Sequence, residues 1–261
     1  MSPELVTTYR AMASRSPVVQ LVNDVDDCSA MITDCAESAL SAVDAGRQVL
    51  VVSPFGRSAE ICQRLSDSNC SMPAHTARFQ PSIQQVKQAL DAGKLGEAGL
   101  LRIHCWNANA GEQESLAREL DLAIWIFGSL PGEVYAVERS GYLQVHLGFD
   151  RGGMALIDLD TVLPNDNEYY SLSLIGSTGA ACSDDHHNMN LLMGNGGTTG
   201  LLTPQGDTAL MAMINNFMIA VRDGGELSPN WSDTQATQQV AGRVHASAQN
   251  QNVFAGRGSH G

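Results

Sequence analysis

Lysine is nearly absent from this sequence of 261 residues. Lys87 and Lys94 are the only two, and 28 acidic residues against 15 basic ones give a formal net charge of −13. Binding to nucleic acid requires clustered lysine and arginine side chains that neutralise phosphates, whereas the arginines here are scattered along the chain. The composition therefore argues against a nucleic-acid partner.

Long apolar runs and paired cysteine motifs are also missing. No apolar stretch approaches the roughly 18–20 residues that a membrane span needs, and residues 1–16 lack the apolar core of a signal peptide. The six cysteines form no CxxC pair, so their spacing fits neither a zinc ribbon nor a redox motif. We therefore expect a soluble, cytoplasmic protein with free, buried thiols and no membrane partner.

Histidines and carboxylates are not arranged as a metal site. The densest group is Asp184-Asp185-His186-His187, but neighbouring residues point in different directions and rarely converge on one ion. We expect solvated turn residues there. His104 and His146 fall in strand-like segments, where we expect packed or surface histidines.

The N-terminal part reads as alternating strands and helices. The apolar run Val18–Val22 predicts a buried strand, followed by an alanine-rich helix that is capped by aspartates near residues 24–27 and stopped by Gly46. Gln48–Val52 predicts a second strand and Ser58–Leu65 a second helix. This order is typical of a parallel α/β layer.

After residue 81 the pattern changes. We predict a helix up to Gly93, a helix with an apolar stripe at Leu116–Phe127, and two final helices at Asp207–Val221 and Asp233–Ala248. Gly194–Gly200 is expected to be a flexible loop. The strand-like segments are Leu100–Trp106, Val134–Arg139, Tyr142–Phe149, Met154–Asp160 and Tyr169–Ile175. The sequence therefore predicts an α/β piece, a boundary near Arg78–Pro81, and an α+β domain with a large, mostly antiparallel open sheet.

Five segments, in order along the chain, carry the motifs of one enzyme family. They are Ala42–Pro54, Arg78–Pro81 with Gly93–Gly96 after its helix, Asp121–Gly128, Ile175–Gly179, and Pro229, Asp233 and Ser247 near the last helix. In this order the sequence resembles the Gfo/Idh/MocA family of nicotinamide-dependent sugar and cyclitol oxidoreductases over residues 18–254. The resemblance implies an incomplete Rossmann-like nucleotide-binding domain over residues 1–80 and the family's C-terminal α+β domain over residues 81–261.

The family's cofactor motif is not found in its usual place. Family members open with a strand and a G-x-G-x-x-G turn that brings a helix N-terminus to the cofactor pyrophosphate. Only 17 residues precede Val18, fewer than the about 30 of a βαβ unit. The one literal match, Gly256–Gly261, ends the sequence without a following helix, and we expect a frayed tail there. No NAD or NADP binding is therefore expected.

The positions that the resemblance marks as catalytic are altered. Ser53 stands where the family has a lysine, and counting back from Asp121 places Arg118 at the catalytic histidine and Glu114 at the catalytic aspartate. A histidine can accept the substrate proton because its pKa is near neutrality, whereas an arginine stays protonated. We therefore predict that the degenerate positions Ser53, Glu114 and Arg118 leave no catalytic residue.

The leading hypothesis is a catalytically inactive relative that acts in ligand binding or assembly. Candidate residues for a small polyol or carboxylate ligand are Arg78, Trp106, Glu114, Arg118 and Asp121, and Arg118 could hold a carboxylate bidentately. The simpler expectation for Arg118 is a surface salt bridge. Phe55–Arg57 is a weak candidate for contacting an anion.

The resemblance also implies a homo-oligomer formed through the open face of the second domain's sheet. Several polar and aromatic side chains are expected on that face and would suit such an interface. They are Tyr142, Gln144, His146, Tyr169 and Tyr170.

Two other interpretations remain open. The chain could be an active NAD(P)-dependent oxidoreductase or lyase acting on a sugar or cyclitol, with a partner subunit supplying the glycine turn and Glu114 or a histidine acting as base. Alternatively, the motif matches are coincidental and the chain is an unrelated α/β protein. A structure without an antiparallel sheet after residue 98 would favour the coincidence.

Overall fold

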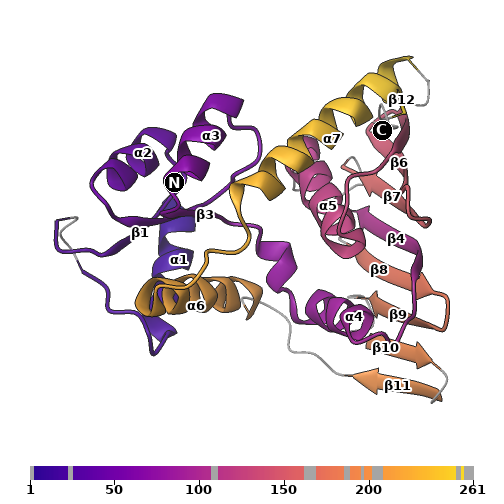
Figure 1. Cartoon of the computed structure of the whole chain (residues 1–261), viewed down its shortest axis with the longest axis horizontal. Helices are drawn as coiled ribbons and strands as arrows, with labels where there is room; N and C mark the ends of the chain where they lie inside the picture. The colour runs from indigo at the N-terminus through magenta and orange to yellow at the C-terminus, as the bar shows by residue number, and fades with distance from the viewer. Residues whose placement is uncertain are drawn as a thin grey trace. The chain divides into compact units, whose positions relative to one another are not determined.

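The computed structural model describes most of the chain as two compact units. The described residues are 3–22, 26–106, 111–161, 169–184, 189–194, 197–201, 208–250 and 254–255. The first unit comprises residues 1–80 and 206–235, and the second comprises residues 81–205 and 236–261 (Figure 1). Residues 206–235, part of the predicted second domain, are thus grouped with the first unit.

The first unit is built around a three-stranded parallel sheet in the order β1-β2-β3. Alternation along β2 sends Val49 and Val51 to one face and Leu50 and Val52 to the other. Helices α2 and α3 and Trp231 cover the first face, whereas α1 and α6 cover the second. The elements are α1 (Pro3–Arg15), β1 (Ala30–Thr33), α2 (Ala36–Asp44), β2 (Gln48–Val51), α3 (Ala59–Asp67), β3 (Ser71–Pro73), the 3₁₀ helix η1 (Thr76–Phe79) and α6 (Thr208–Asp223).

The prediction for the first strand was wrong. Val18–Val22 is not a strand, and Leu21 and Val22 are 43% exposed. The strand lies instead at Ala30–Thr33, where the segment pairs with β2 and its side chains pack between two helical layers. An apolar run alone does not reveal which segment lies next to a partner strand. Helix α1 and strand β3 were not predicted.

The second unit contains a nine-stranded sheet in the order β11-β10-β9-β8-β4-β7-β6-β5-β12. The β4–β7 pair is parallel and the remaining pairs are antiparallel. The antiparallel sheet after residue 98, whose absence would have favoured the coincidence interpretation, is therefore present. Its elements are α4 (Pro81–Asp91), β4 (Ala98–Trp106), α5 (Glu112–Phe127), β5 (Glu133–Arg139), β6 (Tyr142–Gly148), β7 (Met154–Asp160), β8 (Tyr169–Gly176), β9 (Gly179–Asp184), β10 (Met189–Gly194), β11 (Gly197–Leu201) and β12 (Phe254–Ala255).

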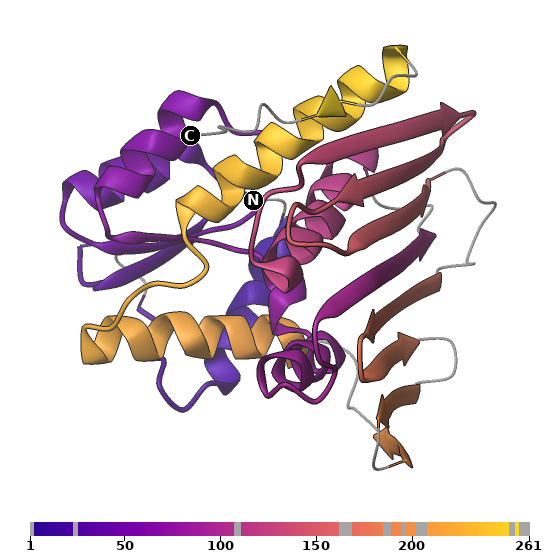
Figure 2. The ribbon, with the colours of Figure 1, turned by 45° about the vertical axis from the view of Figure 1, so that its right-hand side comes forward.

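Helices cover one face of this sheet. Figures 1 and 2 show α4, α5 and the second half of α7 (Trp231–Asn250) on the same side. Helix α7 is attached there by Ser247, whose hydroxyl accepts from the Ala136 N–H at 2.9 Å, and by Arg243, which donates to the Pro131 and Gly132 carbonyls at 2.7 Å. None of the described helices lies on the opposite face, so the predicted open face is present.

Two details correct the sequence interpretation of this unit. Gly194–Gly200, predicted as a loop, belongs largely to the hairpin of β10 and β11. Tyr170, predicted on the open face, pairs with Cys105 and directs its hydroxyl to Glu119 of α5 on the helical side. Asp207, predicted to cap α6, and residues 185–187 of the histidine-rich segment lie outside the described residues.

None of the helices among the described residues combines the length and the apolar character that a membrane crossing demands.

Candidate functional site

Helix α5 carries the positions at which the family resemblance places catalysis. The helix starts after Gly111 and ends at Gly128, which has the left-handed conformation (φ 66°). Glu112 and Glu114 lie in its first turn, where the helix dipole stabilises carboxylates. Glu114 is exposed and Arg118 is half-buried. The structure thus places these candidates one helical turn apart on a helix anchored by its apolar stripe.

Arg118 is fixed by a buried carboxylate. Its Nε donates to Glu119 Oε1 at 2.7 Å, and its Nη2 donates to Cys105 Sγ at 2.9 Å. The guanidinium carbon lies 5.9 Å from the ring centre of Tyr170, whose hydroxyl donates to Glu119 Oε2 at 3.0 Å. The Glu119 side chain is 0% exposed, whereas that of Arg118 is 35% exposed. The expected salt bridge therefore exists, but its acidic partner is buried.

The electrostatics of this cluster keep its protons in place. The Glu119 carboxylate raises the pKa of Arg118 above its usual value. Burial, and then the Glu119 charge, raise the pKa of the Cys105 thiol from 9.0 to about 12. The same two causes, in the same order, raise the pKa of Tyr170 well above 10.0. At neutral pH the cluster therefore consists of a cation, a carboxylate and two neutral groups that keep their protons.

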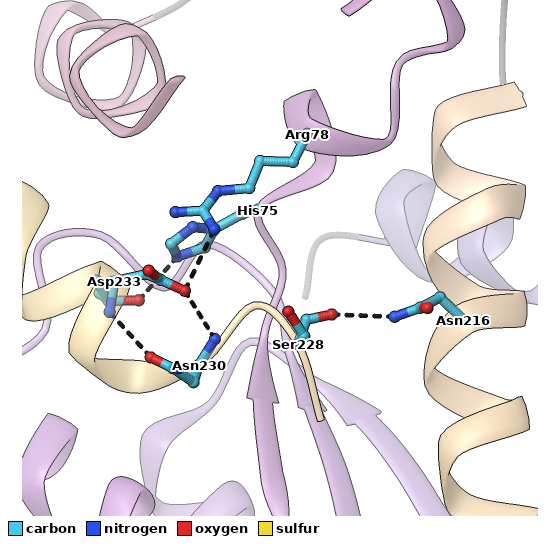
Figure 3. Close-up of polar contacts among 7 residues, drawn as sticks. His75, Arg78, Asn216, Ser228, Asn230 and Asp233 are labelled. Atoms are coloured by element: carbon cyan, nitrogen blue, oxygen red, sulfur yellow. Dashed lines mark hydrogen bonds and ion pairs between the residues drawn. The ribbon is translucent and has the colours of Figure 1, made fainter. Parts of the chain in front are cut away.

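Arg78 occupies a different environment in the first unit. Its Nη1 lies 3.2 Å from Asp233 Oδ2, and its side chain is only 7% exposed (Figure 3). Asp233 also accepts from the Asn230 N–H at 3.0 Å, and Asn230 Oδ1 accepts in return from the Asp233 N–H at 3.1 Å. This reciprocal pair is a capping box at the start of α7. Arg78, predicted to bind substrate, is therefore engaged in fixing a helix N-terminus.

Neighbouring side chains extend this contact network in the first unit. His75 is 2% exposed, its Nε2 lies 2.8 Å from Thr234 Oγ1, and its ring centre lies 4.9 Å from that of Phe55, with the two rings tilted by 38°. Figure 3 also shows Asn216 donating to the Ser228 carbonyl, at 3.0 Å, in the turn that precedes α7. These contacts hold the start of α7 in the first unit.

The segment after β2 contains Ser53, which stands where the family has its lysine. Ser53 is exposed and has a positive φ of 49°, a conformation that few non-glycine residues adopt. Arg57, a weak anion candidate, donates from Nη2 to the Asp34 carbonyl and, at 3.2 Å, to the Val52 carbonyl. Its guanidinium thus serves backbone groups at the ends of β1 and β2.

Trp106 is separated from Arg118 by the sheet. Trp106 is 38% exposed on the open face, with its ring 5.2 Å from that of Tyr169, whereas Cys105, the preceding residue, faces α5 and Arg118. The open face also carries Asp158, which accepts from Tyr142 at 2.7 Å, from Gln144 at 2.9 Å and from His104 at 3.0 Å. Among the described residues, no group of three or more potential ligands could hold a metal ion.

Sequence reasoning missed Glu119, Tyr170 and Cys105 as members of the α5 cluster. One signal was available, because Glu119 falls between Leu116 and Ala123 on the apolar stripe of a helix. A charged residue on such a stripe requires a buried partner. Asp121 is also buried, at 1% exposure, so the structure does not place it at the surface beside Arg118.

Comparison with known proteins gives one sequence match and many structural ones. No protein-family model matches the chain. Inositol 2-dehydrogenase 2 of Saccharopolyspora erythraea is 26% identical over an alignment of 143 residues, which covers 46% of this chain and 42% of that relative. The match therefore spans less than half the length of the curated relative.

The fold is shared with solved dehydrogenase structures. A putative myo-inositol dehydrogenase of Sinorhizobium meliloti superimposes with a TM-score of 0.82 at 17% identity, covering 98% of this chain and 97% of the other. A myo-inositol dehydrogenase of Corynebacterium glutamicum superimposes with a TM-score of 0.80 at 17% identity, covering 98% of this chain and 96% of the other. Levoglucosan dehydrogenase in complex with NADH superimposes with a TM-score of 0.77 at 16% identity, covering 89% of this chain and 81% of the other. These matches support the resemblance: the chain is similar in sequence to an inositol dehydrogenase and has the two-domain fold of inositol and sugar dehydrogenases of the Gfo/Idh/MocA type.

Proposed function

We propose that this chain binds a small polyol or carboxylate without oxidising it. The observation that supports the proposal most directly is Arg118, which occupies the position of the family's general base and is held as a cation by Glu119. Oxidation of an alcohol by hydride transfer requires a group that takes the hydroxyl proton. A guanidinium cannot accept a proton.

The groups next to Arg118 do not replace this base. Cys105 and Tyr170 remain protonated at neutral pH because their pKa values are raised. Both oxygens of Glu119 already accept hydrogen bonds, from Arg118 and from Tyr170, and the Glu119 side chain itself is closed to solvent. The cluster supports binding and orientation of a ligand, and not proton removal from it.

We also propose that the described part of the first unit does not hold a nicotinamide dinucleotide. In such sites a glycine-rich turn lets the pyrophosphate approach a helix N-terminus. The β1–α2 junction passes instead through Asp34 and Cys35, and Glu37 adds a carboxylate to the first turn of α2. The carboxylates of Asp34 and Glu37 would repel a pyrophosphate, so this junction does not fit one.

Arg118 is the group that would select the ligand. Its side chain is 35% exposed although that of its carboxylate partner is fully buried, so part of the arginine side chain is open to a ligand. A carboxylate could bind it with two parallel hydrogen bonds, and vicinal hydroxyls could accept from the same group. Glu114, exposed one turn earlier on α5, would accept from ligand hydroxyls.

The test is a binding series on purified protein by calorimetry and ligand-observed NMR. The ligands are myo-inositol, L-tartrate and NADH, and the variants are Arg118→Lys and the control Arg102→Lys, whose arginine is exposed on the opposite face of the same sheet. We expect one of the first two ligands to bind and Arg118→Lys to weaken it about tenfold through loss of the bidentate contact. Equal affinities in both variants, or no binding of either ligand, would refute the proposal.

Assembly through the open face is a second proposed role. It is supported by the absence of a described helix on that face and by the exposure of Met154 (46%) and Ile175 (47%), since apolar side chains of this size favour burial. Met154→Lys should then reduce self-association measured by sedimentation. Unchanged association would exclude this surface.

An active enzyme is the competing proposal. Its support is the fold shared with levoglucosan dehydrogenase in complex with NADH and the exposed carboxylate of Glu114, with the cofactor held by a partner subunit. Turnover that requires a second protein and is lost in Glu114→Gln would establish it.

A further inference from the structure

The open face of the nine-stranded sheet has an apolar end and a polar, aromatic end. At the apolar end the pairing of β4 with β7 places Leu100 beside Met154. At the polar end the pairing of β4 with β8 places Trp106 beside Tyr169. Leu100 and Trp106 are six residues apart on one strand, which corresponds to about 20 Å. The polar end therefore lies well away from the exposed Met154 side chain, for which assembly is proposed.

A buried carboxylate lies at the polar end. The Asp158 side chain is only 9% exposed, and its Oδ2 lies 3.0 Å from His104 Nδ1. Its Oδ1 accepts from the Tyr142 hydroxyl at 2.7 Å and from Gln144 Nε2 at 2.9 Å. Tyr142 keeps its proton for this bond, because burial and then the bond to Asp158 raise its pKa to about 12. One carboxylate thus holds three side chains from the two strands beside β7.

This network does more to orient side chains than to stabilise the fold. A buried charged pair is weak evidence for stability, because apolar residues of similar volume often serve as well. Leu156, two residues before Asp158 on the same face of β7, is such an apolar residue. A polar network with all its partners present instead fixes its members in one arrangement, as the groups that support a binding site do.

The network leaves one nitrogen of His104 for a ligand. A carboxylate oxygen only accepts, so His104 donates from Nδ1, and the neutral ring has its lone pair on Nε2. Arg102 Nη2 approaches this nitrogen at 3.4 Å, the length of a weak hydrogen bond. The His104 side chain is 25% exposed. A ligand hydroxyl could therefore donate to Nε2 in place of Arg102.

Trp106 provides an apolar surface next to this nitrogen. The residue is 38% exposed, and its ring centre lies 6.3 Å from that of His104 and 5.2 Å from that of Tyr169. Tyr169 is held in turn, because its hydroxyl donates to Asp184 Oδ2 at 3.1 Å. A large aromatic ring among fixed neighbours loses little conformational freedom when a ligand packs on it.

We propose that Trp106 and His104 form a binding site for a neutral pyranose sugar. The C–H face of a pyranose is apolar and would pack on the indole ring, while a hydroxyl at the ring edge would donate to His104 Nε2. Charges of both signs flank the two residues, Arg102 on the same strand and Asp160 paired with Trp106. A neutral ligand with donors and acceptors suits this environment better than an ion. The site is independent of Arg118, which lies on the other side of the sheet.

The first experiment is a titration with cellobiose, whose two β-linked pyranose rings present flat C–H faces. Calorimetry and ligand-observed NMR are applied to the wild type, Trp106→Ala and Trp106→Phe. We expect saturable binding to the wild type, at least tenfold weaker binding to Trp106→Ala, and an affinity within about threefold for Trp106→Phe, which keeps an aromatic face. Trp125→Phe is the matched control, because Trp125 belongs to α5 on the helical side and contacts Lys87.

His104→Phe tests the hydrogen bond separately from the apolar contact. It keeps a ring but removes Nε2, and should weaken cellobiose binding about fivefold. No binding to the wild type would overturn the proposal, including the case in which Trp106→Ala converts a dimer to a monomer and the face is covered by a second copy. Equal affinities of the wild type and Trp106→Ala would also overturn it.

The same titrations distinguish this site from the one proposed at α5. If Arg118→Lys weakened cellobiose binding and Trp106→Ala did not, the sugar would lie at Arg118 and the open-face site would be refuted. If cellobiose bound with the expected dependence on Trp106 while myo-inositol and L-tartrate did not bind, the open-face site would stand and the ligand proposed for Arg118 would fail.

Discussion

Two arginines of this chain, Arg78 and Arg118, were both candidates for ligand binding, and both pair with a carboxylate. They differ in which partner is buried. The Arg78 side chain is 7% exposed and that of its partner Asp233 is 30% exposed, whereas the Arg118 side chain is 35% exposed and that of its partner Glu119 is 0% exposed. The first pair uses the arginine to hold a helix cap, and the second uses the carboxylate to hold an arginine at the surface.

This difference is the reason that we propose ligand binding for Arg118 and not for Arg78. A buried guanidinium has lost its water and is committed to the carboxylate that compensates it. An arginine that is held in place by a buried carboxylate keeps part of its side chain accessible. Because its side chain is already ordered, ligand binding does not have to restrict its conformational freedom further. The comparison supports the proposal that Arg118, in the second unit, contacts a ligand, whereas Arg78 stabilises the cluster in the first unit.

The largest expected effect is on stability after loss of the buried anchor. Glu119→Ala leaves the Arg118 cation and the Tyr170 hydroxyl without their common acceptor, and should lower the free energy of unfolding by about 3–5 kcal/mol. Urea denaturation followed by circular dichroism measures the change. Glu114→Ala, an exposed residue of the same helix, is the control, and an equal loss in both variants would contradict the assigned role of Glu119.

A smaller loss is expected in the first unit. Asp233→Ala removes the capping-box acceptor and the ion pair with Arg78, which together should contribute about 2 kcal/mol. Asp233→Asn keeps an acceptor for the Asn230 N–H and should recover about half of that. If the two variants unfolded at the same urea concentration, the cap would be irrelevant and only the charge of Asp233 would matter.

The smallest effect is a pH dependence that should arise in the second unit. The folded-state pKa of Cys105 is raised from 9.0 to about 12 by burial and Glu119, so the unfolded chain ionises first as the pH rises. The stabilisation is therefore complete below pH 9 and decreases towards pH 12, by about 1 kcal/mol between pH 9 and 10. Cys105→Ala should show a shallower decline over this range, and parallel curves for wild type and variant would contradict the assignment.

Regular, strongly patterned segments were predictable from the sequence. The apolar stripe of α5 and the alternation along β6 indicated both elements because burial on one face fixes the period. The site was predictable only in part. Counting back from Asp121 identified Arg118. It did not identify the groups around Arg118, which are the carboxylate of the adjacent Glu119 and the ring of Tyr170 on a distant strand.

The failures have a common physical cause. Val18–Val22 has the composition of a strand, but strand formation depends on a hydrogen-bonding neighbour, and that neighbour, β2, pairs with Ala30–Thr33 instead. Arg78 was identified from its motif, and nothing in the motif indicated that Asp233, 155 residues later, compensates its charge. Long-range partners of this kind leave no local signal in a single sequence.

The most direct test of the central claim is a turnover assay. Purified protein is incubated with myo-inositol and NAD⁺ or NADP⁺, and separately with an inosose and NADH or NADPH, while reduced nicotinamide is followed by absorbance. We predict no turnover in either direction, because Arg118, at the position that the family resemblance gives to the base, is held as a cation by Glu119. Turnover that is abolished by Arg118→Lys or Glu114→Gln would show that α5 retains catalytic chemistry and would contradict this prediction.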